Sequence, residues 1–172
     1  MRQTFLLCLT IFLFTACSIK HNDIKPNSIN LTAKMQKLSI LIQSLSKEIK
    51  KEEANSIAYE SISYSKKLAN DYNIIPPALF HNSLINMGLK EKGYCYHYAN
   101  DLLKYLKTKK YKSFYLTKVV SQRGQYFEHT SIIITRDNIK FEDSIILDAW
   151  RNSGILFFSK VKNDERYDWE IK

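Results

Sequence analysis

Long apolar runs are almost absent from this sequence of 172 residues. The clearest one, Phe5–Phe14, is shorter than the ~20 residues that a transmembrane helix needs, so we predict no membrane-spanning helix there. Internal repeats and a sustained heptad pattern are also missing. The length suits one domain with its own core and is too short for two ordinary ones.

Negative charge is in short supply as well. The chain has 26 lysines and arginines against 17 acidic residues, a formal net charge of +9, and the positive residues are scattered rather than gathered in blocks. This pattern favours a solvated, lysine-rich surface. Attraction to an anionic envelope polymer or membrane surface is the alternative, and no nucleic-acid partner is expected for an exported protein.

The N-terminus has the features of an export signal. Residues 1–16, MRQTFLLCLTIFLFTA, combine Arg2, the apolar run and small residues before Cys17, the order found in secretory signals. The junction LFTAC resembles the signal of bacterial lipoproteins, in which the cysteine is lipidated and becomes the first residue. An ordinary secretory signal with an incidental cysteine is the alternative.

The lipoprotein resemblance implies a membrane anchor and a location. A diacylglycerol and an acyl chain such as palmitate on Cys17 would hold the chain stably at the membrane, since two or more chains suffice. Ser18, rather than an aspartate, after the cysteine implies the periplasmic face of the outer membrane in the bacterial cell envelope. Residues 17–32 are polar and are predicted to be a lipidated tether.

Cysteine is the next scarce residue, with only three in the chain. Cys8 lies in the segment that export removes, and lipid would block Cys17, so Cys95 has no partner for an intramolecular disulfide. Exported proteins usually pair their cysteines. A lone thiol of this kind is either reactive or packed in the core as a small hydrophobic residue.

Residues 33–172 are predicted to form a single α+β domain. Apolar residues at helical spacing predict two consecutive helices, or one bent helix, over 33–75, with a phase shift near residues 50–53. Pro76-Pro77 breaks this pattern and begins a short helix, and a further helix begins at Cys95. Later segments are rich in β-branched and aromatic residues and predict antiparallel strands: SFYLTKVV, FEHTSIIIT, SIILDAW and GILFF.

Cys95 lies where thiol chemistry would be favoured. Free backbone N–H groups and the positive end of a helix dipole stabilise a thiolate at a helix start. Downstream, a hairpin turn centred on Asn138-Ile139 would place His129 directly opposite Asp148, so that the carboxylate could hold the imidazole. His97, two residues after Cys95, is expected to point away, and His81 to be structural.

GYCYHYA resembles the nucleophile motif of the bacterial transglutaminase-like branch of the papain-like thiol enzymes, and the order Cys95, His129, Asp148 is the order of that branch. The resemblance covers roughly residues 77–160 and implies an α+β core with a nucleophile-bearing helix packed on an antiparallel sheet. It implies that Cys95 is the nucleophile, His129 the general base and acid, and Asp148 the residue that orients the imidazole. No cofactor is implied.

Four further residues are candidates for supporting roles. Asn82 and Asn86 are possible oxyanion donors, or else helix-cap or surface residues. Trp150, expected on the same strand face as Asp148, could shield the His–Asp hydrogen bond or simply fill the core. Arg151 could bind a substrate carboxylate or pair with a surface acid.

The function that follows is an envelope-anchored thiol hydrolase or acyltransferase acting on an amide or peptide bond, with hydrolysis favoured. Its substrate would be a peptide, a protein or a cell-wall peptide. A cysteine peptidase of another branch fits less well, because no histidine follows His129 to act as a second orienting residue. A non-catalytic lipoprotein that uses the fold for binding or scaffolding remains an alternative. A metal site is not predicted, because Cys95 and His97 lack two further ligands at a recognisable spacing.

Overall fold

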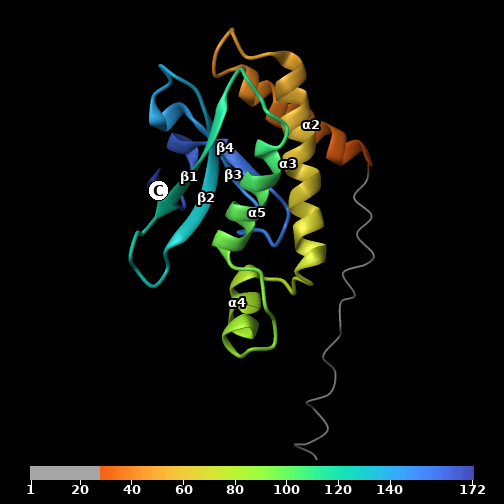
Figure 1. The fold of residues 1–172 in the computed structure, drawn as a ribbon, viewed down its shortest axis with the longest axis vertical. Helices are drawn as coiled ribbons and strands as arrows, with labels where there is room; N and C mark the ends of the chain where they lie inside the picture. Colours follow the sequence, from red (N-terminus) through yellow and green to blue (C-terminus); the bar gives the residue numbers. More distant parts are fainter. Residues whose placement is uncertain (1–27) are drawn as a thin grey trace, which may run out of the picture. The chain divides into compact units, whose positions relative to one another are not determined.

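The structure is a computed structural model and describes residues 28–172 (Figure 1). The predicted signal peptide, Cys17 and most of the predicted tether lie outside the described residues. Helix α2 (Ser28–Gln43) begins inside the segment 17–32 that was predicted as a tether. Residues 32–172 form one compact unit. Within the described part of the chain, no helix has the length and apolar character needed to cross a membrane.

Three more helices follow α2. They are α3 (Lys51–Asp71), α4 (Ala78–Asn86) and α5 (Cys95–Lys107). The predicted phase shift corresponds to the break between α2 and α3. Helix α4 begins at Ala78, one residue after the predicted start, and Pro77 is its N-cap. Helix α5 buries one stripe at three- and four-residue spacing, Tyr98, Ala99, Leu102, Leu103 and Leu106.

The strands form one five-stranded antiparallel sheet in the order β4-β3-β2-β1-β5. Their bounds are β1 (Tyr115–Ser121), β2 (His129–Thr135), β3 (Ile145–Asp148), β4 (Phe157–Lys160) and β5 (Glu170–Ile171). The predicted α+β class is therefore confirmed. The short strand β5 was not predicted, and β3 ends two residues before the end of the predicted strand SIILDAW.

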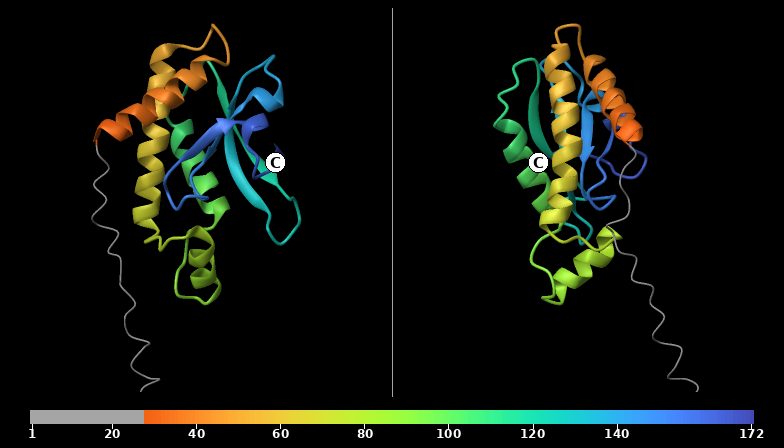
Figure 2. Two further views of the ribbon diagram at one scale, coloured as in Figure 1. Left: turned by 180° about the vertical axis from the view of Figure 1, so that it is seen from behind. Right: turned by 90° about the vertical axis from the view of Figure 1, so that its right-hand side faces the viewer.

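The two faces of the sheet are covered differently (Figures 1 and 2). Helices α3 and α5 lie on one face. The other face carries the two short 3-10 helices η3 (Phe141–Asp143) and η4 (Val161–Asn163) and the C-terminal segment. A small core on this second face joins the sheet to Trp169, and consists of buried Val119, Ile133, Ile146 and Trp169 with Phe141, Phe157, Val161 and Tyr167 packed around it.

The register of the β2–β3 hairpin differs from the predicted one. Ile133 pairs with Ile146 and Ile132 with Leu147, a shift of two residues that removes His129 from the position directly opposite Asp148. The prediction assumed a tight turn, whereas the connection contains η3 and moves the centre of the hairpin by one residue. Because side chains alternate with a period of two, a shift of two leaves His129 and Asp148 on the same face.

Candidate active site

The start of α5 holds Cys95 in a defined position. The ring nitrogen Nδ1 of His97 accepts hydrogen bonds from the backbone N–H groups of Gly93 and Tyr94, at 3.1 and 3.3 Å. Burial, and then the charge of Lys92, lower the pKa of His97, which suits this acceptor role. Cys95 is the first residue of the helix, so its N–H lies beyond the reach of the intrahelical hydrogen bonds.

The loop before Cys95 is held by a second histidine. His81 is fully buried on α4, where its Nδ1 accepts a hydrogen bond from the Ile75 N–H at 3.1 Å and its Nε2 lies 2.9 Å from the Lys92 carbonyl. Gly93 has φ +138°, and a Cβ atom there would lie 2.4 Å from the His81 ring. The glycine two residues before Cys95 is thus required both by its backbone conformation and by the close approach of this ring.

His129 and Asp148 form a buried pair. His129 is the first residue of β2 and Asp148 the last of β3, and His129 Nε2 lies 2.7 Å from Asp148 Oδ2. Their side chains are 3% and 1% exposed. In the observed register the two residues are diagonal neighbours, a separation that a histidine side chain can bridge.

The Asp148 carboxylate is fully engaged. Besides His129, it accepts hydrogen bonds from the Trp150 N–H at 2.9 Å, the Arg151 N–H at 3.1 Å and Arg151 Nε at 2.7 Å. Burial would raise the pKa of Asp148, but the charges and hydrogen bonds of His129 and Arg151 hold it well below its usual range. Asp148 is therefore ionised in the folded protein at any physiological pH.

Arg151 links this carboxylate to a second buried acid. Its Nη1 and Nη2 atoms donate to the two oxygens of Asp164 at 3.0 and 2.5 Å, and Trp169 Nε1 donates to Asp164 Oδ2 at 2.8 Å. The guanidinium also lies over the Phe157 ring, 3.8 Å from its centroid. Neither of the two roles considered for Arg151, binding a substrate carboxylate or pairing with a surface acid, is what the structure shows, because its guanidinium pairs with two buried acids.

The His129 ring is enclosed by aromatic side chains. The centroids of Tyr167, Trp150 and Trp169 lie 4.4, 4.9 and 5.3 Å from that of His129. This burial alone would lower the pKa of His129. The charge and hydrogen bond of Asp148, with a smaller contribution from Cys95, outweigh it and raise the pKa to about 9.

Cys95, the first residue of α5, lies close to the chain just before β2. Its Sγ atom lies 3.8 Å from the backbone carbonyl of Glu128, the residue before His129. Because Asp148 takes Nε2, the nitrogen left for the thiol is Nδ1, which is buried and has no hydrogen-bond partner of its own in the structure.

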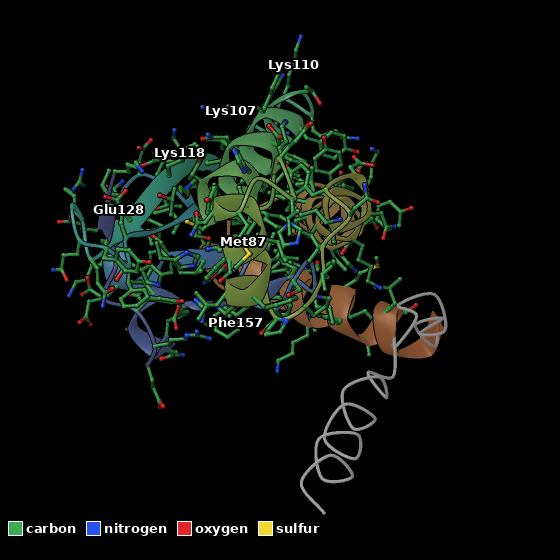
Figure 3. The ribbon with its side chains drawn as sticks, turned by 90° about the horizontal axis from the view of Figure 1, so that it is seen from below. Met87, Lys107, Lys110, Lys118, Glu128 and Phe157 are labelled. Atoms are coloured by element: carbon green, nitrogen blue, oxygen red, sulfur yellow. The ribbon has the colours of Figure 1, made fainter. Side chains whose placement is uncertain are left out.

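Cys95 and His129 line one cleft of about 250 Å³. Leu79 of α4 and the loop between β1 and β2, with Tyr126 and Phe127, border it, and Trp150, Arg166 and Tyr167 contribute to its wall. Figure 3 looks onto this end of the molecule, with Met87, the residue that follows α4, near its centre and Glu128, just before β2, to the left. Asp148 lies behind the cleft rather than in its lining.

The structure distinguishes between the residues that were candidates for supporting roles. Asn82 lines the cleft, and its Oδ1 lies 3.4 Å from the indole nitrogen of Trp150, whereas Asn86 is exposed and hydrogen-bonded to the Tyr94 hydroxyl. Asn82 is thus the better placed oxyanion donor. Trp150 lies in the turn after β3, not on the strand as predicted, yet its ring still covers His129.

Sequence reasoning missed the residues of the C-terminal segment that support the site, among them Asp164, Tyr167 and Trp169. Asp164 and Trp169 come from the C-terminal segment and reach Asp148 through Arg151. Neither position carries a recognisable motif, and a buried partner for Arg151 can be identified only when the C-terminal segment is placed on the sheet.

No set of three or more potential metal ligands gathers among residues 28–172. Comparison of the chain with protein-family models, with curated proteins and with solved structures gave no match. The interpretation of the site therefore rests on its geometry.

Proposed function

We propose that the chain is a lipid-anchored thiol enzyme of the bacterial cell envelope that cleaves or transfers an amide or peptide bond. The observation that carries this proposal is the meeting of Cys95, at a helix start, with a buried His129–Asp148 pair on one open cleft. The core would be papain-like in the transglutaminase-like arrangement, and the anchor would be Cys17.

Each residue has a role that its surroundings support. The Cys95 thiolate attacks the carbonyl carbon of the amide, and the imidazolium of His129 gives its proton to the departing amine. A thioester on Cys95 results. Water, or an amine in a transfer reaction, then attacks the thioester while His129 takes up its proton, and the sulfur leaves as thiolate.

The surroundings of His129 suit its role in donating and accepting a proton. Asp148 orients the ring and stabilises its cationic form, and the aromatic enclosure keeps water away from the His–Asp hydrogen bond. The tetrahedral intermediate would place its oxyanion near the Cys95 N–H and the Asn82 amide. Hydrolysis is the favoured outcome, because no amine-binding site is identified.

A non-catalytic binding role is the second candidate, and one observation favours it. Helix α4 and the residues after it expose a set of large apolar side chains that the fold itself does not use: Leu79, Phe80, Met87 and Leu89. Such a surface on a scaffold could receive a partner protein.

Alkylation of Cys95 by iodoacetamide, measured across pH, separates the two. The full-length protein is labelled, and mass spectrometry follows the peptide that contains Cys95. Labelling that stays fast well below the value of ~8.5 for free cysteine supports the thiol enzyme. If Cys95 reacts only after the protein has been unfolded, the thiol-enzyme proposal is eliminated. His129→Gln serves as the matched control and should lose the fast labelling at low pH.

A further inference from the structure

Arg166 carries a positive charge that no carboxylate of the described residues neutralises. It is exposed, it lines the cleft, and its guanidinium lies 5.3 Å from the centroid of the Tyr167 ring. The other arginines in residues 28–172 each form an ion pair with an acidic side chain, namely Arg123 with Glu170, Arg136 with Glu48, and Arg151 with Asp148 and Asp164. Arg166 therefore differs from them in both location and pairing.

The remaining charges of the cleft are balanced. Among the described residues of the lining, Glu128 is the only acidic one, and it accepts hydrogen bonds from the Gly124 N–H at 2.8 Å and from Lys172 Nζ at 3.0 Å. His129 is balanced by Asp148 behind it. Among the described lining residues, Arg166 is left as the one positive charge without an acidic partner.

Next to this charge the rim is apolar. Leu79, Tyr126 and Phe127 are 51%, 89% and 63% exposed, and the Tyr126 and Phe127 rings meet edge to face at 4.9 Å. Large exposed apolar groups around a cleft are typical of a ligand-binding site. A ligand that satisfies both features has an apolar group and a negative charge a short distance apart.

We infer that the cleft accepts an acidic peptide segment, whose carboxylate binds Arg166 while a neighbouring apolar side chain packs against Leu79, Tyr126 and Phe127. The scissile amide then lies over Cys95. This inference rests on the proposed thiol chemistry and adds a substrate class to it. A guanidinium suits this role because its planar donor fork matches a carboxylate.

Two alkylating reagents of nearly equal size test the charge preference. In both, the sulfur of Cys95 attacks the methylene carbon and iodide leaves, but iodoacetate is anionic and iodoacetamide is neutral. We expect Arg166→Gln to lower the iodoacetate-to-iodoacetamide rate ratio by about fivefold, the effect of one opposite charge at close range in water. Arg166→Lys should restore part of it.

Arg123→Gln is the matched control, since Arg123 is exposed, pairs with Glu170 and does not line the cleft. Its rate ratio should equal that of the wild type. A ratio unchanged by Arg166→Gln would overturn the inference and leave the thiol enzyme standing. Slow wild-type labelling by iodoacetamide at low pH would instead overturn the proposed function itself.

A second measurement tests the combined ligand. N-acetylphenylalanine, which has both a carboxylate and an aromatic side chain, should protect Cys95 from iodoacetamide better than its uncharged carboxamide does. The difference should disappear in Arg166→Gln. Equal protection by both compounds in the wild type would contradict recognition of the carboxylate.

Discussion

The two sides of the cleft are built on opposite principles. Behind His129, charged groups are buried and fully paired: Asp148, Arg151 and Asp164 form a continuous chain with side-chain exposures of 1%, 5% and 1%. Across the cleft, α4 and the β1–β2 loop present apolar side chains to solvent, with Tyr126 89% exposed.

The difference separates two tasks. A buried network holds its members in one arrangement, because each unpaired charge would be costly in the protein interior. Exposed apolar side chains on a loop carry little of the folding free energy and can adjust to what they contact. The molecule therefore fixes the groups that would do chemistry and leaves the groups that would contact a ligand adaptable.

Substitution of the proposed nucleophile, Cys95, should have the largest effect on turnover. Cys95→Ser should lower turnover of an activated ester or amide by on the order of 10⁴-fold, as expected for removal of a member of a catalytic triad. Far-ultraviolet circular dichroism and the urea midpoint should stay close to those of the wild type, because Cys95 lies at the cleft. Normal turnover in this variant would remove Cys95 as the nucleophile.

Asp148→Asn removes a charge from the buried network behind His129. We expect turnover to fall by about 10²- to 10⁴-fold through loss of imidazole orientation, and the free energy of unfolding to fall by about 3 kcal/mol because Arg151 loses a buried partner. Kinetics and urea unfolding measure the two effects. Asp143→Asn is the control, since Asp143 is one-third exposed and pairs with Lys160 and Lys162. An Asp148→Asn variant as active as this control would contradict the assigned role.

The pH dependence of stability and of turnover should also reflect the buried side of the cleft, through His129. The pKa of His129 is raised to about 9 from an unfolded value of about 6.5. Its contribution to stability is thus fully present below pH ~6.5 and is lost as the pH rises to about 9, by roughly 3 kcal/mol in total. Urea unfolding across this interval measures it, and His129→Gln should flatten the profile. Turnover should also decline above pH ~9, when no imidazolium remains to protonate the leaving amine.

The exposed side should give the smallest effect on stability. Tyr126→Ala is expected to change the free energy of unfolding by no more than about 0.5 kcal/mol, since surface substitutions rarely do more. It should nevertheless weaken protection of Cys95 by N-acetylphenylalanine. A large loss of stability in this variant, measured by urea unfolding, would contradict the claim that the exposed side contributes little to the free energy of folding.

Much of the fold was accessible from the sequence because its signals are local. Helical spacing, Pro76-Pro77 and the β-branched segments predict α2 to α5 and the first four strands, with errors of a few residues at their ends. Strand β5 is only two residues long, and such a segment carries no periodicity to recognise.

The residues of the candidate site could be predicted from the sequence, but the residues that hold them in place could not. The hairpin argument brought His129 near Asp148 through the wrong register, and it succeeded in part because an even shift preserves the face. The partners of Arg151 could not be predicted, because Asp164 and Trp169 meet it only through the packing of the C-terminal segment.

The turn that follows Asp148 has one further consequence for the helices that precede the core. Gly154 has φ +95°, and a Cβ atom there would lie 2.3 Å from the Cβ of Ala69 on α3. The stretch that positions Arg151 is thus pressed directly against a helix encoded some eighty residues earlier. Helix α3 thus supports the turn that carries Arg151 and follows Asp148, and a chain shortened to begin at Pro77 would lose that support together with the core residues of α3.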